Sequence, residues 1–534
     1  MPAPAADPWQ HRIDAALGMA QRGALAEAAA ALAALCGERP RNALPHILLA
    51  TVRHRLGEHD EALRELDAAA SLSPGDPQVP AMRPRLLLAA GRAVDAEAAA
   101  RRVLASAPDD PHAQFDLACA LQAQQRWDES GAACAALLER HPGHVAARHL
   151  LSRSLLMRGD ADGALAQARH PALLDDPATA FAVAADFGAR DAQAQRAALL
   201  CALAARHPQD YACAIASADA LLAANRAGEA LAQAQRAGSL RPQASRPRQL
   251  RAAALIERGD TQPGLALFRG LFEQGGLDAA DAQKYLIALH YDSEQQPQPM
   301  YAAHAAWAAR HAQPFAPPFV AQPETERKLR VGWLSPRFNE GPVARFLTGT
   351  LRAFDREHYH HLLLELHGLR DACTDAFEAI SDETVALHGL DDETLLARLR
   401  GLRLDVLVDL AGHAPFGRPR VLAQRVAPVQ LSWLDWFDTT GLPNMDGWIG
   451  DRWLNPPDSP QRFSETVLRL GGGRFCYTPP DHAPQPQREG GGAPVLVSFN
   501  RTAKLNDRVI DAWARILAAV PDARLLLGDR AFDD

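Results

Sequence analysis

A lysine near the C-terminal end of the chain stands in a setting that favours phosphate binding. The segment "SFNRTAKLND" spans residues 498–507, follows the apolar run Val495-Leu496-Val497, and precedes "RVIDAWARILAAV", whose apolar spacing is helical. This pattern predicts a strand, a loop and a helix, with Lys504 where the helix begins. Free N–H groups and the positive end of a helix attract anions, and a lysine adds charge there. A solvated surface lysine is the alternative reading of the same segment.

Composition predicts a soluble, helix-rich protein. A chain of 534 residues is long enough for two to four domains, and aromatic residues make up only 6% of it. The net charge of −8 gives no electrostatic case for a nucleic-acid partner. The seven cysteines show no CxxC pair and no metal-ligand spacing, the N-terminus lacks a signal peptide, and no apolar run is long enough to span a membrane. We therefore expect reduced thiols, a cytoplasmic location and no membrane partner.

Prolines recur every 34 residues in the N-terminal half. The series consists of Pro40, Pro74, Pro108 and Pro142, and it resumes with Pro208 and Pro242. Glycine or glutamine stands 17 residues before each of the first four prolines, and alanine or serine follows five residues later. Glycine permits a tight turn, alanine lets two helices approach closely, and proline ends the second helix. The pattern resembles the tetratricopeptide repeat (TPR) and predicts an α-solenoid, a superhelix of about seven or eight repeats over residues 9–280, with a distorted repeat near 165–200.

The inner groove of such a solenoid takes extended peptides, so we expect a protein or peptide partner. Polar residues of the first helices that could face this groove are His46, Arg53, Arg83, Asp116, Arg148 and Arg153. The alternative for each of them is an ordinary solvated helix face. No regular asparagine ladder is present, so binding directed at the peptide backbone is not expected.

An α/β domain follows a linker of helices and prolines at residues 281–327. The predicted strands are residues 329–335, 360–366, 384–390, 404–410 and 428–434, and helical patterns separate most of them. This alternation predicts a doubly wound, Rossmann-like domain over residues 328–490, whose ligands bind beyond the carboxyl ends of the strands. The candidate site therefore lies in the loops 335–343, 409–413 and 435–446.

Seven segments occur in an order that resembles a known family. They are "AAHAAWAARH", "LRVGWLSPRF", "DVLVDLAGH", "RVAPVQLSWL", "TTGLPNMD", "FCYTPP" and the loop that contains Lys504. The order resembles the bacterial relatives of O-linked N-acetylglucosamine transferase, the TPR–SPINDLY-type glycosyltransferases. The resemblance implies a GT-B fold, in which two Rossmann-like domains face a cleft and the second holds a UDP-sugar. It also implies metal-independent and cofactor-free transfer of N-acetylglucosamine or another hexose to Ser or Thr of a TPR-bound protein. The sequence leaves the oligomeric state undecided, and a homo-oligomer is one possibility.

The resemblance assigns roles to individual residues. Lys504 looks like the family's lysine that contacts the donor diphosphate, where a fixed cation would stabilise the leaving UDP. The implied catalytic residues are Lys504 and His413. The implied donor-binding residues are Asn500, Arg501, Lys504, Thr439, Thr440, Gly441 and Asp409.

Two departures weaken the expected chemistry. Gly341 stands where the family has a histidine that faces the active site, and the neighbouring Glu340 is either a replacement base or a solvated loop residue. Trp436-Phe437-Asp438 replaces the family's Tyr-Pro-Gly, and an aspartate repels a diphosphate unless a cation intervenes.

The second Rossmann-like domain is only begun at residues 494–534, and the family's His-Thr-Thr helix start is not in the chain. One explanation is a truncated sequence of an enzyme. The other is a short TPR scaffold with a degenerate glycosyltransferase lobe. We expect the segment to lean on the first α/β domain or to remain loose. We also expect residues 1–534 alone to bind no UDP-sugar specifically and to catalyse no transfer, while peptide binding by the groove survives.

Overall fold

The computed structural model describes residues 8–321, 327–480, 483–485 and 492–529. The chain divides into two compact units, residues 1–224 and 225–534. This division falls inside the predicted repeat array, so the predicted domain limits stay a proposal. None of the helices in the described residues is long and apolar enough to cross a bilayer.

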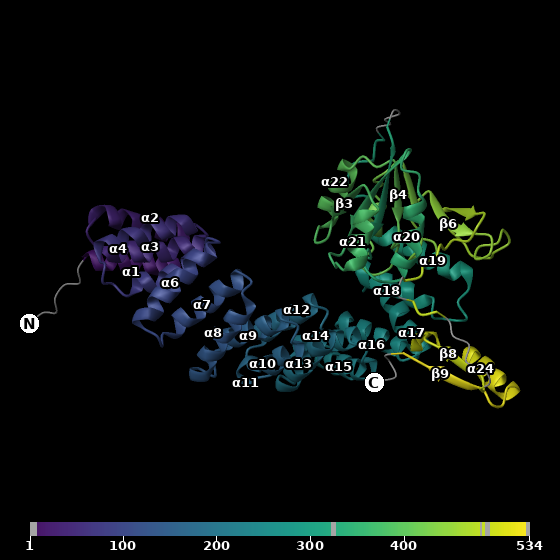
Figure 1. Cartoon of the computed structure of the whole chain (residues 1–534), viewed down its shortest axis with the longest axis horizontal. Helices are drawn as coiled ribbons and strands as arrows, with labels where there is room; N and C mark the ends of the chain where they lie inside the picture. The colour runs from purple at the N-terminus through teal and green to yellow at the C-terminus, as the bar shows by residue number, and fades with distance from the viewer. Residues whose placement is uncertain (1–7, 322–326, 481–482, 486–491, 530–534) are drawn as a thin grey trace, which may run out of the picture. The chain divides into compact units, whose positions relative to one another are not determined.

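The first unit consists of antiparallel helix pairs (Figure 1). Its helices are α1 (Pro8–Gln21), α2 (Leu25–Glu38), α3 (Ala43–Leu56), α4 (His59–Leu72), α5 (Gln78–Ala89), α6 (Ala93–Ser106), α7 (Pro111–Ala123), α8 (Trp127–Arg140), α9 (Val145–Met157), α10 (Ala161–Ala168), α11 (Pro171–Leu174), α12 (Pro177–Ala189), α13 (Gln193–Arg206) and α14 (Tyr211–Ala223).

The repeat signature produces these pairs as predicted. Gly57 caps α3 with φ 84°, a left-handed conformation that glycine adopts without strain, and Gln125 takes the same conformation two helix pairs later with φ 59°. Ala62 and Ala96, at the predicted contact positions, are fully buried between helices. The distorted repeat is also present, because α10 has only eight residues and the four-residue α11 follows it.

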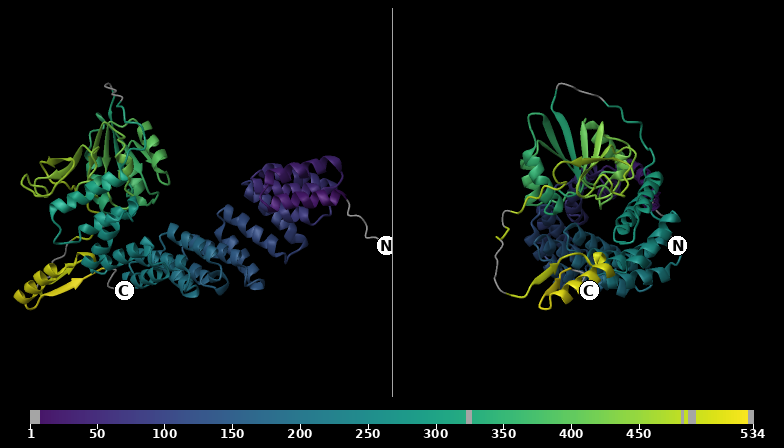
Figure 2. Two further views of the ribbon diagram at one scale, coloured as in Figure 1. Left: turned by 180° about the vertical axis from the view of Figure 1, so that it is seen from behind. Right: turned by 90° about the vertical axis from the view of Figure 1, so that its right-hand side faces the viewer.

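The second unit begins with further helices and continues into a sheet (Figure 2). The leading helices are α15 (Ala227–Leu240), α16 (Ser245–Glu257), α17 (Thr261–Glu273), α18 (Ala279–Leu289) and α19 (Pro297–His311). The strands are β1 (Leu329–Ser335), β2 (Tyr359–Glu365), β3 (Glu383–Ala386), β4 (Val406–Asp409), β5 (Val429–Ser432), β6 (Gly447–Asp451) and β7 (Thr466–Leu470). The helices between them are α20 (Pro342–Ala353), α21 (Ala372–Ala379), α22 (Asp392–Gly401) and α23 (Pro419–Leu422).

All seven strands pair in parallel, in the order β3-β2-β1-β4-β5-β6-β7. The predicted fold class, a helical solenoid followed by a Rossmann-like domain, is confirmed. Sequence reasoning missed β6 and β7. The "GWIGD" of β6 contains two glycines, and β7 is an edge strand whose side chains are mostly exposed, so neither carries the apolar run of a buried parallel strand.

Alternate residues of the central strands enter two different cores, as the two-residue period requires. Trp333 and Val408 pack on the face covered by α20 and α21. Leu334 and Leu407 pack on the opposite face, in a core that also contains Trp307 of α19. The helix with Trp307 therefore joins the helices of this unit to its sheet.

The C-terminal segment forms a small separate sheet. Strands β8 (Val495–Ser498) and β9 (Arg524–Leu527) pair in parallel, and α24 (Asp507–Ala519), which connects them, has no buried residue. Arg501 makes an ion pair with Glu257 of α16, and Arg508 makes one with Glu294. The expectation that this segment leans on the sheet domain or remains loose is wrong, because it attaches to the helices of its unit, as Figures 1 and 2 both show.

Candidate functional site

The strand order reverses direction between β1 and β4. In doubly wound sheets this switch point is the usual ligand position. Asp409, which ends β4, pairs with Leu334, and Leu334 directly precedes Ser335 at the end of β1. Across this edge Arg337 pairs with Asp435, which follows β5, at 3.2 Å. The predicted loops therefore do meet at one edge.

Asp409 shapes the loop after β4. Its buried carboxylate accepts hydrogen bonds from the backbone N–H groups of Ala411 (3.1 Å) and Gly412 (2.9 Å). Burial raises the pKa of Asp409 to about 6, because the lost hydration outweighs the two N–H contacts that favour its charge. Gly412 has φ 54°, and a Cβ there would lie 2.5 Å from Trp436. The loop therefore needs both the carboxylate and the glycine.

His413 joins the loop after β4 to the threonine turn after β5. Its Nε2–H donates to the carbonyl oxygen of Thr440 at 2.7 Å, and its ring meets Trp307 edge-on at 4.6 Å. Burial, with His304 nearby, lowers the pKa of His413 to about 3. A general base works best with a pKa near the working pH, so this environment suits a positioning role. The predicted catalytic role of His413 stays a prediction.

The threonine turn is held by a buried carboxylate that sequence reasoning missed. Glu465 Oε2 accepts from the hydroxyl of Thr439 at 2.7 Å, and Glu465 Oε1 accepts from both the backbone N–H (2.7 Å) and the hydroxyl of Thr440. Gly441 follows with φ 72°, and a Cβ there would lie 2.6 Å from the backbone carbonyl of His304. The threonine hydroxyls therefore already have a partner within the protein.

Asp438 is also directed inward. Its carboxylate accepts from the N–H of Thr439 at 2.7 Å and from the amide of Gln461 at 3.2 Å, and His290 Nε2 lies 3.8 Å away. Burial raises the pKa of Asp438. The predicted repulsion between Asp438 and a diphosphate stays a prediction.

Glu340 lies on the surface, next to Gly341 at the start of α20. Its carboxylate pairs with Arg345 (Nε to Oε1, 3.0 Å) and accepts from the thiol of Cys373 at 3.0 Å. These hydrogen bonds lower the pKa of Glu340. A carboxylate with a lowered pKa is a weak base, so the geometry favours the solvated loop residue over a replacement base.

The lysine loop lies on the C-terminal segment. Lys504 ends a short 3-10 turn, Thr502–Lys504, ahead of α24 rather than at its first residue, and its side chain is exposed. The amide of Asn500 donates to the hydroxyl of Ser498 at 3.1 Å. Arg501 makes a bidentate pair with Glu257, with both contacts at 2.6 Å. The structure thus brings Asp409, His413 and the threonine turn together, and it holds the lysine loop on a separate small sheet.

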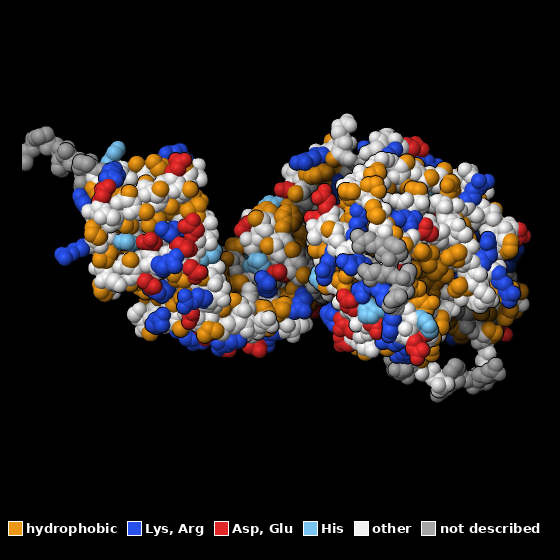
Figure 3. Space-filling view, turned by 90° about the horizontal axis from the view of Figure 1, so that it is seen from above, with side chains coloured by type: hydrophobic (Ala, Val, Ile, Leu, Met, Phe, Trp, Pro, Cys, Tyr) orange, Lys and Arg blue, Asp and Glu red, His pale blue; other side chains and the backbone are white. Residues whose placement is uncertain are grey.

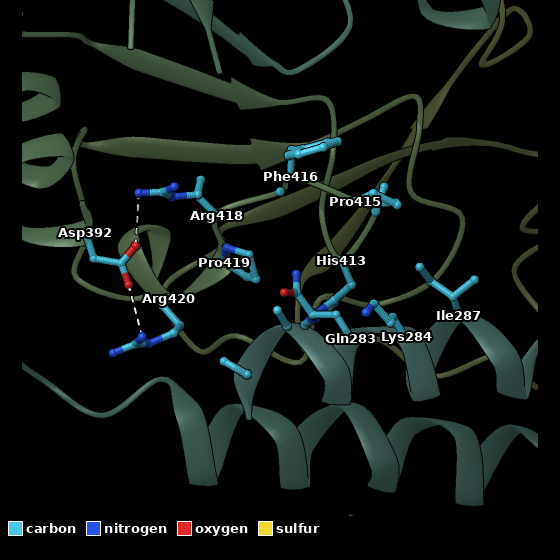
Figure 4. Close-up of a pocket in the computed structure, with 14 residues that line it drawn as sticks. Gln283, Lys284, Ile287, Asp392, His413, Pro415, Phe416, Arg418, Pro419 and Arg420 are labelled. Atoms are coloured by element: carbon cyan, nitrogen blue, oxygen red, sulfur yellow. Dashed lines mark ion pairs between the residues drawn. The ribbon is translucent and has the colours of Figure 1, made fainter. Parts of the chain in front are cut away.

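A cavity of about 450 Å³ lies between α18 and the loop after β4. Figure 4 shows Gln283, Lys284 and Ile287 of α18 on one side and the loop residues His413 to Arg420 on the other. Arg418 and Arg420 each pair with Asp392 at 3.2 Å. Phe416 at its rim is 60% exposed and has φ 67°, a costly conformation for an aromatic residue. Cavities of this size take small molecules or short peptide segments.

Five of the six predicted groove residues of the first unit have partners within the repeats. His46 contacts Glu65 at 2.7 Å, and Arg83 contacts Asp67 at 2.6 Å. Figure 3 shows acidic and basic side chains interleaved over the N-terminal repeats. Paired charges of this kind are typical of a solvated helix face.

Comparison with known proteins finds a family that the sheet domain resembles. Residues 306–476 match the model of glycosyl transferase family 41. Residues 306–476 are therefore similar to family 41 glycosyltransferases, and we call this segment the family 41 domain. The matched segment begins at α19 and runs past β7, so it includes Trp307, the loop after β4, the threonine turn and Glu465. The predicted resemblance to TPR-containing O-linked N-acetylglucosamine transferases is confirmed.

Relatives extend the likeness beyond the family 41 domain. A Solanum lycopersicum protein named "Probable UDP-N-acetylglucosamine--peptide N-acetylglucosaminyltransferase SPINDLY" is 31% identical over 264 residues, which are 47% of this chain and 28% of that protein. The Arabidopsis thaliana protein of the same name gives the same identity and coverage. A solved mutant of the Thermobaculum terrenum O-GlcNAc transferase is 26% identical, with a TM-score of 0.49, over 79% of this chain and 69% of that one. The chain spans little more than a quarter of the length of the curated relatives it matches.

Proposed function

We propose that this protein takes part in protein O-glycosylation, with a UDP-sugar as donor and a Ser or Thr hydroxyl of a repeat-bound protein as acceptor. The observation that carries the proposal is the family 41 match over residues 306–476, in a chain whose preceding residues form TPR-like helix pairs. The transferred sugar in this proposal is N-acetylglucosamine or another hexose. The reaction needs neither metal nor cofactor in this proposal, because a fixed cation serves the leaving group.

Lys504 is the proposed cation. Its exposed ammonium group follows β8, where the segment 498–507 leaves the small sheet. Charge builds up on the diphosphate as the sugar–oxygen bond breaks, and a lysine placed there stabilises that charge by about 2–4 kcal/mol. In this proposal Asp409 and His413 position the loop after β4 and the threonine turn, and they carry no proton to or from substrate.

The cavity beside α18 is the proposed acceptor side of the site. It lies between a helix that follows the repeats and the loop after β4 of the family 41 domain. Its wall combines apolar groups such as Phe416 and Ile287 with the charged Lys284. Such a wall suits a short polypeptide segment, whose apolar side chains and backbone carbonyls both find partners.

The test uses the protein purified through an N-terminal tag from the cell that makes it. The preparation is incubated with UDP-N-acetylglucosamine and with other UDP-hexoses, and modified Ser and Thr residues of co-purified proteins are identified by mass spectrometry. When a complete donor domain is present, we expect transfer from one donor, and we expect Lys504→Ala to lower the rate at least about thirtyfold while partner binding and folding are unchanged. Residues 1–534 alone should catalyse no transfer. Equal transfer by a well-folded Lys504→Ala protein would contradict the role of the lysine.

A non-catalytic scaffold is the second candidate. The glycine at position 341 and the surface pairing of Glu340 with Arg345 favour it, since no histidine stands where the family has one. This candidate predicts that partner proteins co-purify with the protein but gain no sugar from any donor. The same mass-spectrometric experiment therefore separates the two functions.

A further inference from the structure

Three chemically different side chains converge within the first unit, far in sequence from the family 41 domain. Cys36 on α2, His46 on α3 and Glu65 on α4 place a sulfur, a nitrogen and an oxygen atom within 4.8 Å of one another. Cys36 is buried, and the side chains of His46 and Glu65 are only 15% and 20% exposed. Each ligand comes from a separate helix, so the packing of the repeats fixes their positions.

We propose that Cys36, His46 and Glu65 form a binding site for a divalent cation of the zinc class. Thiolate, imidazole and carboxylate together are ligands that zinc prefers, whereas calcium and magnesium prefer oxygen alone. In a tetrahedral zinc site, bonds of about 2.0–2.3 Å place the ligand atoms roughly 3.3–3.8 Å apart. Side-chain shifts of about 1 Å would therefore bring the sulfur, nitrogen and oxygen atoms to these distances. Three protein ligands leave the fourth position of a tetrahedral ion open to exchangeable water.

The neighbouring arginine is compatible with this site. Arg53 Nη2 lies 3.7 Å from Oε1 of Glu65, whereas His46 Nδ1 lies 2.7 Å from the other oxygen, Oε2. The metal takes Oε2, and Arg53 stays on Oε1. Arg53 Nη1 also lies 3.7 Å from Oε2 of Glu58, so a second carboxylate balances the charge of the guanidinium. An arginine on the free oxygen orients the carboxylate, as outer contacts of metal ligands commonly do.

The proton balance of binding follows from these contacts. Without metal, His46 Nδ1–H donates to Glu65 Oε2. A metal on Nδ1 would replace that hydrogen, and the imidazole ligand would carry its N–H on Nε2. The thiol of Cys36 becomes a thiolate, which releases one proton to solvent. Affinity should therefore rise about tenfold for each pH unit while the thiol remains protonated in the free protein.

The site is independent of the proposed transfer reaction. Its ligands lie in the first compact unit, and no step of the reaction uses them. A bound cation would tie α2, α3 and α4 together and stabilise the N-terminal repeats, because it binds the folded form only. The chemistry thus concerns the stability of the repeat array rather than sugar transfer.

Cobalt(II) is the probe, because a cobalt–thiolate bond gives a charge-transfer absorption that carboxylate and imidazole ligands do not give. The reduced full chain is titrated with Co²⁺ and then with Zn²⁺. We expect one cobalt per chain, a charge-transfer band, and loss of that band when zinc is added. A chain that shows no saturable band would contradict the proposal.

Matched variants locate the ligands. Cys36→Ala should abolish the band, whereas Cys134→Ala, which removes an equally buried thiol from helix α8, should keep it. Glu65→Gln should weaken binding about tenfold or more. Zinc should raise the melting temperature of the unaltered chain and of Cys134→Ala but not of Cys36→Ala. If Cys36→Ala does not fold, as judged by circular dichroism, His46→Asn decides the question by the same titration. A band that survives loss of either ligand would overturn the assignment.

Discussion

The threonine turn at residues 439–441 and the lysine loop at residues 498–507 are both predicted to meet the donor diphosphate, yet the protein holds them in opposite ways. The turn is buried, and Glu465 binds both threonines. The side chain of Lys504 is exposed, and a surface ion pair between Arg501 and Glu257, together with the buried Ala503, attaches the lysine loop to α16. The first region is therefore enclosed by buried partners, whereas the second is attached on one side only, by the Arg501 ion pair and the buried Ala503.

This difference has an energetic basis. A buried carboxylate that accepts several hydrogen bonds is costly to disturb, because its partners lose bonds that water cannot replace. An exposed ion pair contributes about 0–1 kcal/mol and is screened by salt. The predictions below test whether the two regions respond to mutation as differently as their contacts require.

Removal of Glu465 should have the largest effect. Glu465→Ala leaves the N–H and hydroxyl groups of the threonine turn without their acceptor, and we expect a loss of about 3–5 kcal/mol in the free energy of unfolding of the second unit. Chemical denaturation followed by tryptophan fluorescence measures this loss. Glu357→Ala, which removes an exposed glutamate from the same domain, should change the free energy by less than about 0.5 kcal/mol. Similar values for the two variants would mean that the turn does not depend on its carboxylate.

Acid should destabilise the second unit through His413. Its pKa in the folded protein is about 3, below the ordinary 6.5, so its contribution is complete above pH 6.5 and is lost as pH falls toward 3. Asp409 acts in the opposite sense, because its raised pKa of about 6 favours the folded state at low pH and that contribution is lost as pH rises through 6. Between pH 6.5 and 4 we expect His413 to cost about 3 kcal/mol.

The His413→Asn variant measures this contribution. It has no group that titrates in this range, so its free energy of unfolding should fall less steeply with acid than that of the unaltered protein. Denaturation curves at several pH values give both slopes. Parallel slopes would show that protonation of His413 does not oppose folding.

A side chain at position 441 should be harmful for two separable reasons. Gly441→Ala places a Cβ 2.6 Å from the His304 carbonyl and also strains a backbone with φ 72°. We expect a loss of about 2–3 kcal/mol. Gly389→Ala is the matched control, because its φ is 74° but no atom lies within 4 Å of the added Cβ, so it should cost only about 1 kcal/mol. Equal costs would show that the contact between the turn and α19 is loose.

Loss of the arginine that attaches the lysine loop should have the smallest effect on stability. Arg501→Ala should lower the global free energy of unfolding by less than about 1 kcal/mol, since the guanidinium is half-exposed. Hydrogen exchange of residues 495–527 should nevertheless become faster, because the segment loses its attachment to α16. Arg425→Ala removes a comparable pair with Asp446 in the sheet domain and should leave this exchange unchanged. Slow exchange in both variants would mean that apolar contacts, not Arg501, hold the segment.

Local patterns predicted much of this structure from the sequence. Gly57 and Ala62 act through their own backbone and size, so their spacing alone indicated the helix pairs. The strand at 329–335 was predicted in full, because it carries the apolar run of a buried parallel strand. Glu465 could not be predicted, since its partners lie more than 20 residues away and only the fold brings them together. The attachment of Arg501 to Glu257 likewise joins positions 244 residues apart.

Calorimetry of UDP binding to residues 1–534 tests the central claim most directly. Among the described residues, the proposed contacts for a diphosphate are the exposed Lys504 and the threonine turn, whose hydroxyl groups already donate hydrogen bonds to Glu465. Two such features at a solvated site should give a dissociation constant in the millimolar range, roughly 4 kcal/mol of binding free energy. We expect weak heats that Lys504→Ala abolishes and that Arg501→Ala leaves nearly unchanged. A micromolar dissociation constant for UDP would contradict the account, because it would require a donor site that these residues do not form.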